Sequence, residues 1–176
     1  MPITKVLILF VGFIFPFQDV PSEQTTSTRV TLEIRLAEYE RSVGLIETNS
    51  VGPQQKIYLH KEALVTNKDV IEASVVRFQA AKEISEAMRS LGVKDVRDVG
   101  DTYEIKVGFT KEAGDRMAKA TENHMGKPLA LLIDGKVISA PIVSGTIRDR
   151  ASLIGGGGLG FTKDEAQRIA NALNMK

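Results

Sequence analysis

The sequence contains no cysteine. Such a chain forms no disulfide, offers no thiolate to a metal or a substrate, and has no N-terminal cysteine to carry a lipid anchor. Redox chemistry and lipoprotein anchoring are therefore excluded. The absence does not identify a compartment, because proteins without disulfides occur on both sides of a membrane.

The chain also lacks an excess of charge of either sign. Its 23 Lys and Arg residues are balanced by 22 Asp and Glu residues. No long-range field therefore draws the protein toward nucleic acid or anionic lipid, and we expect no nucleic-acid partner. With 43% hydrophobic residues among 176, the chain is long enough for one medium-sized domain with its own core.

A hydrophobic run long enough to span a membrane is missing. The longest run, residues 6–15, follows Lys5 and ends at Pro16, whereas a spanning helix needs about 20 apolar residues. A short apolar run after a positive charge is typical of a secretory signal. We predict that residues 1–20 are a signal peptide or an uncleaved anchor, the only segment to contact a membrane, with a buried strand or helix as the alternative. Polar residues 21–28 then form a linker into a domain at 29–176.

Several strands are predicted in the first half of that domain. Residues 30–36 alternate between apolar and polar side chains, which indicates a half-buried strand. Residues 44–55 contain glycine, proline and polar residues without periodicity, and we interpret them as a loop. Further strands are expected at 56–60 and 74–78, with a turn at 66–69 between them.

The middle of the chain predicts a helix followed by a hairpin. Residues 79–91 have helical spacing, and Gly92 stands where a helix ends. Two segments, 93–99 and 102–109, flank Gly100 and Asp101, which predicts a hairpin turn. The apolar stripe of the helix consists of Ala81, Ile84, Ala87, Met88 and Leu91.

Two further helices begin after similar segments. Gly-Phe-Thr-Lys occurs at 108–111 and again at 160–163, which is either recurring capping chemistry or a structural repeat. Thr162 and Glu165 have the spacing of a capping box. The expected buried stripes are Ala113, Met117, Ala120 and His124 in one helix and Ala166, Ile169, Ala170 and Leu173 in the other.

Between these helices, Asp134 and Gly135 separate the apolar runs 129–133 and 136–143. Asp-Gly between two such runs is a strong hairpin signal, because both residues tolerate the positive φ of a type I′ turn. Strands and helices thus alternate along the chain. We expect an α+β fold: a two-layer sandwich of ferredoxin-like character, with helices on one face of a mostly antiparallel sheet.

One glycine-rich segment has the form of a binding motif. The cluster Gly155, Gly156, Gly157, Gly158 and Gly160 formally contains G-x-G-x-x-G before a helix. Only 16 residues follow it, which leaves no room for the second strand and acidic residue of a dinucleotide site, so we interpret it as a flexible loop or bulge with weak anion binding as the alternative.

Residue types that often act in catalysis are present, but they do not form recognisable motifs. His60 and His124 are far apart and lack a metal-ligand spacing, and we interpret His124 as stabilising a helix end. No Gly-x-Ser-x-Gly motif is present. The helical carboxylates Glu83, Glu86, Glu112, Asp115 and Asp164 resemble solvated faces. We predict a non-enzymatic protein without cofactor or metal.

One stretch resembles a known family. Residues 126–141 are similar to the signature hairpin of the periplasmic head domain of SecD, a subunit of the bacterial protein-export machinery. The similarity continues through 147–150 and 158–166, and upstream matches lie at 32–36, 58–66 and 109–114. The motif residues are Gly126, Lys127, Pro128, Asp134, Gly135, Ser139, Ala140, Pro141, Phe161, Thr162 and Glu165.

The resemblance implies an exported domain that handles translocated polypeptide outside the membrane, with export-channel subunits as partners. The expected contact surfaces are the 129–143 hairpin and the glycine cluster, where bare backbone lets another chain approach. The family's transmembrane, proton-coupled part has no counterpart after residue 20, and residues 79–101 do not align with the family. The alternative is a periplasmic binding or regulatory module that docks a partner protein or small ligand independently of export.

Overall fold

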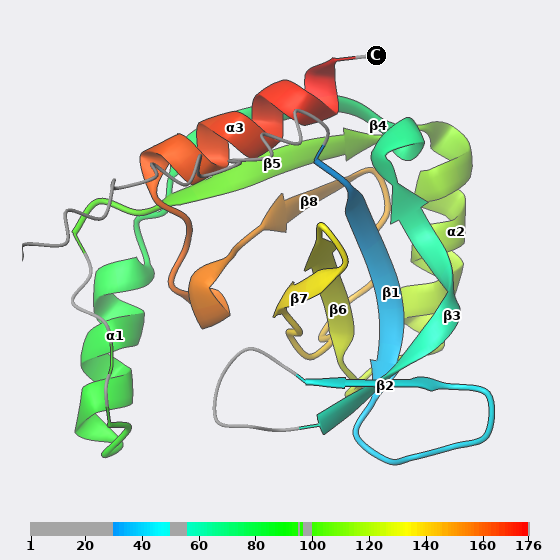
Figure 1. Ribbon diagram of the computed structural model, residues 1–176, viewed down its shortest axis with the longest axis horizontal. Coiled ribbons are helices and arrows are strands. Elements are labelled where there is room, and N and C mark those ends of the chain that lie inside the picture. Colours follow the sequence, from blue (N-terminus) through cyan, green and yellow to red (C-terminus); the bar gives the residue numbers. More distant parts are fainter. Residues whose placement is uncertain (1–29, 50–55, 95, 97–99, 176) are drawn as a thin grey trace, which may run out of the picture.

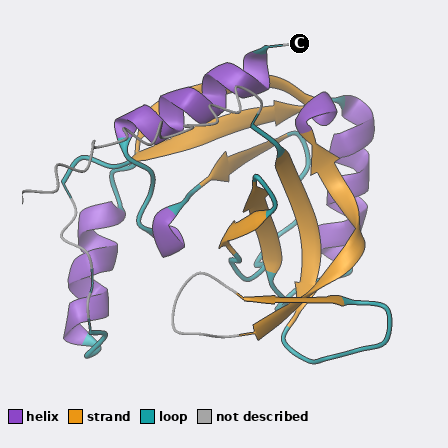
Figure 2. Ribbon diagram, viewed as in Figure 1, coloured by secondary structure: helices purple, strands orange, loops and turns teal. Residues whose placement is uncertain are grey.

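The computed structural model describes residues 30–49, 56–94, 96 and 100–175. Within these residues the chain forms three α-helices, two short 3-10 helices and eight strands, which confirms the α+β class (Figures 1 and 2). The strand pairs are antiparallel, as predicted, but they belong to two sheets where one was expected. The ferredoxin-like arrangement is not confirmed. The predicted signal or anchor and the linker lie outside the described residues.

The larger sheet contains β1 (Leu32–Glu38), β2 (Ile46–Asn49), β3 (Lys56–Thr66), β6 (Leu129–Ile133) and β7 (Lys136–Ser139). Their order is β2-β3-β1-β6-β7, so β1 is central. All five residues of β6 are buried. The strand is covered on both faces, which explains why its sequence is an unbroken apolar run without alternation.

The smaller sheet contains β4 (Val70–Arg77), β5 (Tyr103–Phe109) and β8 (Arg150–Leu153), in the order β4-β5-β8. A short 3-10 helix, η1 (Asn67–Asp69), connects β3 to β4. The chain therefore passes from one sheet to the other within three residues, at the turn that the sequence predicted.

Three helices complete the fold: α1 (Ala81–Ser90), α2 (Lys111–Glu122) and α3 (Lys163–Asn174). α3 lies along β4 and β5, and α2 contacts β3 and β5 (Figure 1). The predicted α3 stripe is confirmed, because each of its four residues is at most 2% exposed. In α2, Ala113 and Met117 are buried as predicted.

Two groups of buried side chains stabilise the fold. The larger one lies between the two sheets and under α2 and α3, and it includes alternate residues of β6. The other residues of β6 face a smaller cluster on the opposite side of the larger sheet. This second cluster consists of Ala37, Ile57, Leu59, Ala130, Leu132 and Val137.

Several predicted elements were wrong in extent or pairing. The segment interpreted as a loop at 44–55 contains β2, and β3 continues six residues beyond His60 to Thr66. β8 was not predicted. The hairpin across Gly100 was also wrong, because β5 pairs with β4 and β8. Most of its expected partner strand, 93–99, lies outside the described residues.

The predicted helix at 79–91 exists as α1, but its apolar stripe is not a core face. Ala81 is buried, whereas Leu91 is 84% exposed. In Figure 1, α1 projects from the body formed by the two sheets. The helical spacing was therefore predicted correctly, and the burial was not.

Candidate functional site

The turn of the β6–β7 hairpin has the predicted geometry. Asp134 has φ of 50° and Gly135 has φ of 73°, the positive values that a type I′ turn requires. Asp134 also joins the turn to the start of β1: its Oδ1 accepts from Thr31 N at 2.9 Å, and its own N–H donates to Thr31 O at 2.9 Å. The hairpin tip is thus attached to the central strand.

We expect Gly135→Val to destabilise the protein by about 1 kcal/mol or more, because a β-branched side chain resists a φ of 73°. The space around a Cβ at this position is open, so the cost comes from the backbone alone. Urea denaturation measures it, with Gly135→Asn as the control because Asn tolerates positive φ. Equal stability of the two variants would contradict the turn assignment.

The residues before the hairpin connect α2 to the sheet. Gly126 has φ of 77° and donates its N–H to Val143 O at 2.9 Å. Lys127 O accepts from Val143 N, and the carbonyl of the fully buried Pro128 accepts from Ala37 N at 3.0 Å. The Gly-Lys-Pro segment at 126–128 therefore binds the far end of the hairpin at Val143 and the central strand at Ala37.

The far end of the hairpin is less regular. Ser139 pairs with Leu131 after a register shift, and β7 ends there. Ala140 packs against the smaller core cluster, while Pro141 O accepts from Leu129 N at 2.8 Å. The predicted second strand, 136–143, is thus four residues long, followed by an isolated bridge between Pro128 and Ile142.

The glycine cluster interrupts the edge of the smaller sheet. Leu153 in β8 pairs with Ile105, and Phe161 pairs with Tyr103, only two residues away on β5. Residues 154–160 therefore leave the edge and return to it, and Gly155 O accepts from the N–H groups of Gly158 and Gly160, both at 3.0 Å. The cluster is a folded excursion from an edge strand.

The protein's own side chains fill part of the space that the glycines leave. A Cβ at Gly155 would collide with the ring of Phe161, and one at Gly160 would lie 2.9 Å from Thr102 Cβ. Positions 156 and 158 have positive φ, and a Cβ at Gly158 would meet no atom within 4 Å. Fewer glycines of the cluster are therefore open to another chain than the sequence suggested.

The excursion contains the short 3-10 helix η2 (Gly156–Gly158), but it does not form the start of α3. Phe161 stands between it and α3, whose first turn is capped by Thr162. Thr162 Oγ1 accepts from Glu165 N at 3.3 Å, and the Glu165 carboxylate accepts from Thr162 N at 3.0 Å, which is the predicted capping box. The N–H groups of Thr162 and Glu165 therefore already have internal acceptors.

The structure brings together two histidines that the sequence separates. His60 Nε2 lies 3.4 Å from Glu38 Oε1, Lys127 Nζ donates to the same oxygen at 3.2 Å, and the two imidazole rings are 5.8 Å apart. The ring of His124 is buried, and its Nε2 lies 2.8 Å from Ala37 O. His124 therefore contacts β1, a contact that the interpretation as a helix-end residue did not include.

The charge of Glu38 depends on these neighbours. Burial alone would raise the pKa of its carboxyl, but the hydrogen bonds from Lys127 and His60 outweigh burial and lower the pKa below its usual value. Among the described residues, no group of three His, Asp or Glu side chains is placed to hold a metal ion.

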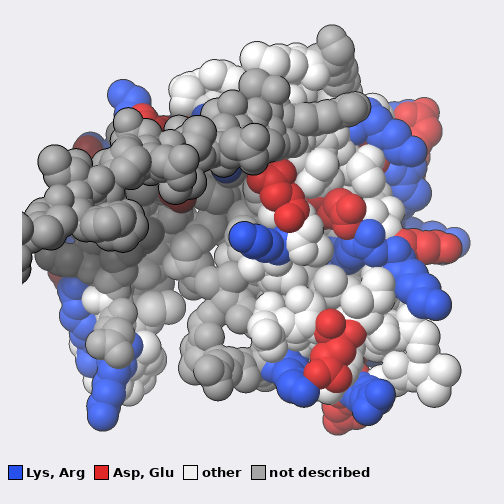
Figure 3. Space-filling model, viewed as in Figure 1, with Lys and Arg blue, Asp and Glu red and all other residues white. Residues whose placement is uncertain are grey.

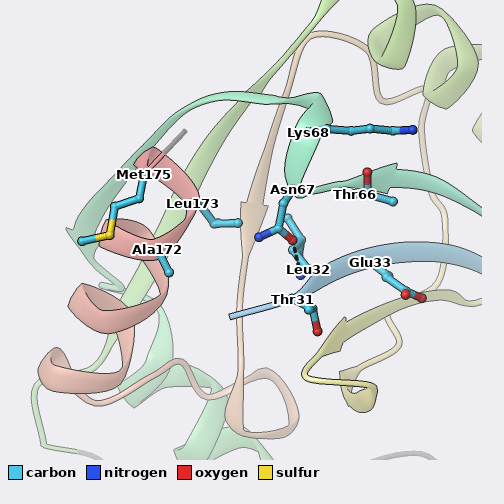
Figure 4. Close-up of a pocket in the computed structure, with 9 residues that line it drawn as sticks. All are labelled: Thr31, Leu32, Glu33, Thr66, Asn67, Lys68, Ala172, Leu173 and Met175. Carbon is cyan, nitrogen blue, oxygen red and sulfur yellow. Dashed lines mark hydrogen bonds between the residues drawn. The ribbon is translucent and has the colours of Figure 1, made fainter. Parts of the chain in front are cut away.

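A mostly apolar cavity of about 790 Å³ lies where the start of β1, η1 and the end of α3 meet. Figure 4 shows Asn67 projecting across it, where its Oδ1 accepts from Leu32 N. Asn67 Nδ2 donates to Val30 O at 2.7 Å. The cavity is lined by Thr31, Leu32, Glu33, Thr66, Asn67, Lys68, Ala172, Leu173 and Met175. The sequence analysis did not identify this cavity.

The visible surface of the described residues has no broad patch of a single charge. On the face shown in Figure 3, Lys and Arg side chains lie among Asp and Glu without a broad field of one sign. None of the helices that the structure describes is long and apolar enough to cross a membrane.

The chain was compared with protein families. Residues 92–175 match the family described as SecDF, P1 head subdomain. This range includes both the hairpin and the glycine cluster. It begins within residues 79–101, so the part from residue 92 onward does have a counterpart in the family, contrary to the expectation from sequence.

Curated relatives are SecD proteins. The protein translocase subunit SecD of Aquifex aeolicus is 35% identical over 80 residues, which are 46% of this chain and 14% of the relative. The SecD of Syntrophobacter fumaroxidans is 27% identical over 142 residues, 81% of this chain and 26% of the relative. The chain thus spans between about a seventh and a quarter of these two proteins.

Solved structures show the same fold. A structure of SecDF, described as a membrane component that enhances protein export, matches with a TM-score of 0.54 and 20% identity over 83% of this chain and 62% of that one. SecDF in its super-membrane-facing form matches with a TM-score of 0.53 and 21% identity, over 83% of this chain and 19% of that one.

The fold and the matched segment together describe an α+β domain that is similar to a SecD head. Its hairpin, its edge excursion and the capped helix after it all lie within the matched range. Residues 92–175 are similar to the P1 head subdomain of SecDF, and the curated relatives are SecD proteins.

Proposed function

We propose that this domain is a non-enzymatic module that handles extended polypeptide during protein translocation, on the outer side of a membrane. The match of residues 92–175 to the P1 head subdomain carries the proposal, because the SecD relatives are protein translocase subunits. The apolar run at residues 6–15 supports an exported or membrane-associated location. N-terminal sequencing of the native protein from each cell fraction tests that location.

The physical route is a sheet edge that offers backbone hydrogen bonds to any extended chain, with shallow apolar contacts that add limited selectivity. The cavity at the end of α3 and the exposed Pro141 and Ile142 at the end of the 129–143 hairpin supply apolar surface. Gly156, which is exposed, and Gly158, which has open space around its Cβ position, are the part of the glycine cluster that another backbone could approach. Export-channel subunits are the proposed protein partners.

We expect the full chain to bind reduced and alkylated α-lactalbumin, which stays unfolded, with micromolar affinity. The native, disulfide-bonded form should bind at least about tenfold more weakly, because its backbone groups are already paired. Isothermal titration calorimetry measures both. Since the net charge is +1, the affinity should change little between low and moderate ionic strength.

The second candidate is a module that docks a folded partner or a small ligand independently of export. The pocket of about 740 Å³ beside Glu38, His60 and Lys127 favours it, because it combines charged groups of both signs. Equal affinity for unfolded and native α-lactalbumin, or no binding of either, would select this alternative. Affinity capture from a membrane extract would then be expected to recover no export-channel subunit.

A further inference from the structure

The smaller sheet has an unusually long free edge. β4 is an edge strand of eight residues, whereas the other described edge strands, β2, β7 and β8, have four each. We propose that extended polypeptide binds by adding a strand to the free edge of β4, and that the side chain of Asn174 occupies one position of that edge until the polypeptide displaces it. This inference rests on the proposed function and names the site at which it operates.

Asn174 already makes the contacts that an added strand would make. Its Nδ2 donates to Ala73 O at 2.8 Å, and its Oδ1 accepts from Ala73 N at 2.9 Å. A side-chain amide carries the same donor and acceptor as a peptide group. The pair of bonds at Ala73 is the pair that one residue of an antiparallel neighbour would exchange with it. The occupant that fits this edge is therefore another peptide backbone.

In an antiparallel pair, the backbone N–H and C=O groups of successive residues point alternately toward the partner strand and away from it, which identifies the outward groups of β4. Phe78 N–H donates to Thr102 O at 2.8 Å, so Phe78 faces β5. Residues of opposite parity, Ala73, Val75 and Arg77, then direct their N–H and C=O groups away from β5. Within the described chain, the outward backbone groups of Val75 and Arg77 have no recorded hydrogen-bond partner. Such groups act as a template for another strand.

The surroundings of the edge suit an apolar extended segment. Val75 and Val76 are half-buried, and Ile71 is 57% exposed. The chain immediately before β4 lines the 790 Å³ cavity, as do Leu173 and Met175 on either side of Asn174. A polypeptide that continues along β4 past Ala73 would thus reach apolar surface for its side chains.

The edge is tested by proline substitution in the full chain. Val75→Pro removes one outward N–H and places the proline ring where an added strand would lie, while the bonds to β5 remain. Ser152→Pro is the matched control on β8. Phe109 N donates to Asp149 O, so by the same alternation Ser152 also faces outward. The titrant is reduced and alkylated α-lactalbumin.

We expect Val75→Pro to weaken binding about tenfold or more and Ser152→Pro to change it less than twofold. Asn174→Ala frees the backbone of Ala73. This variant should bind about threefold to tenfold more tightly. Hydrogen exchange of the unmodified protein provides an independent measurement: the titrant should protect the amides of Val75 and Arg77, even if Val75→Pro fails to fold.

The outcomes separate this inference from the proposed function. If the unmodified protein binds the unfolded titrant but exchange at Val75 and Arg77 is unaffected, the edge assignment is wrong and the proposed function stands. Equal weakening by both proline variants would also overturn the edge. If exchange protection appears with increasing protein concentration and without titrant, the edge pairs with a second copy of this chain, and the inference fails. Absence of any binding removes the proposed function as well.

Discussion

Gly155→Ala should lower the free energy of unfolding by about 3 kcal/mol, the upper range for inserting a methyl group into a packed site. The backbone at Gly155 has φ of −90° and ψ of −165°, which alanine adopts without strain. The cost is therefore steric. A Cβ would lie 2.7 Å from Phe161 Cδ1 and 2.8 Å from its Cζ.

Phe161 has little freedom to move away. Its ring is only 7% exposed and belongs to the main core, and its backbone is paired with Tyr103 in both directions at 2.8 and 2.9 Å. Moving the ring would leave a cavity. Moving the backbone would break the bridge between Phe161 and Tyr103, which lies just before α3. The clash at Gly155 thus affects both the edge excursion and the last helix.

Two control glycines separate steric cost from backbone cost. Gly145 has open space around its Cβ position and no positive φ, so Gly145→Ala should leave stability within about 0.5 kcal/mol. Gly158→Ala has open space but a φ of 98°, and should cost about 1 kcal/mol. Urea denaturation of the three variants gives the order. A Gly155→Ala protein as stable as Gly145→Ala would show that the ring does not pack against this glycine.

The sequence predicted best the features with local causes. Asp134 and Gly135 form the expected turn because positive φ is a property of the two residues themselves. Thr162 and Glu165 form the expected capping box for the same reason. These contacts join residues at most three apart, so a short window of sequence contains both partners.

Features that depend on distant partners were not predicted. β2 and β8 have four residues each, and only Leu153 among them is buried, so neither has an apolar alternation to recognise. The division into two sheets depends on which strands pair across many residues, and the hairpin at Gly100 failed for this reason: β5 pairs with β4, across the inserted helix α1. Tertiary pairing overrode a good local turn signal.

Candidate-site residues were missed for the same reason. Asn174 contacts Ala73, 101 positions away, and Asn67 contacts Val30 and Leu32. In sequence both are ordinary polar residues at the end of an element. The glycine cluster leaves the sheet edge as a bulge or loop would, but its short 3-10 helix and the filling of its space by Phe161 required the fold.

Asp69 should be the most sensitive carboxylate in the domain, because it lies where the two sheets meet. Its side chain is 11% exposed. Its Oδ2 accepts from Thr66 N and Thr66 Oγ1, both at 2.9 Å, and its Oδ1 accepts from Arg116 Nη2 at 2.8 Å. Its backbone carbonyl accepts from Thr110 N at 2.8 Å. The residue thus ties η1 to α2 and to the end of β5.

Asp69→Ala should lower the free energy of unfolding by about 2 kcal/mol, because it leaves the Thr66 N–H without its acceptor and removes the ion pair with Arg116, whose guanidinium keeps only Leu64 O as an acceptor. The matched control is Asp115→Ala, which removes ion pairs with Lys111 and Arg148. Asp115 is half-exposed, and exposed ion pairs contribute little because water and salt screen them. We expect no measurable loss of stability for this control in chemical denaturation.

The pH dependence provides a second readout of the same site. Burial alone would raise the pKa of Asp69, but the Thr66 N–H and Arg116 outweigh burial and lower the pKa below its ordinary value. A lowered pKa means that the carboxylate stabilises the fold above its unfolded pKa of about 4, and that this contribution is lost as the pH falls below that value. The stability difference between the unmodified protein and Asp69→Asn should therefore be largest at neutral pH and shrink below about pH 4. Urea denaturation at pH 7, 5 and 3 measures it, and a difference that stays constant over this range would show that the charge of Asp69 does not stabilise the junction of the sheets.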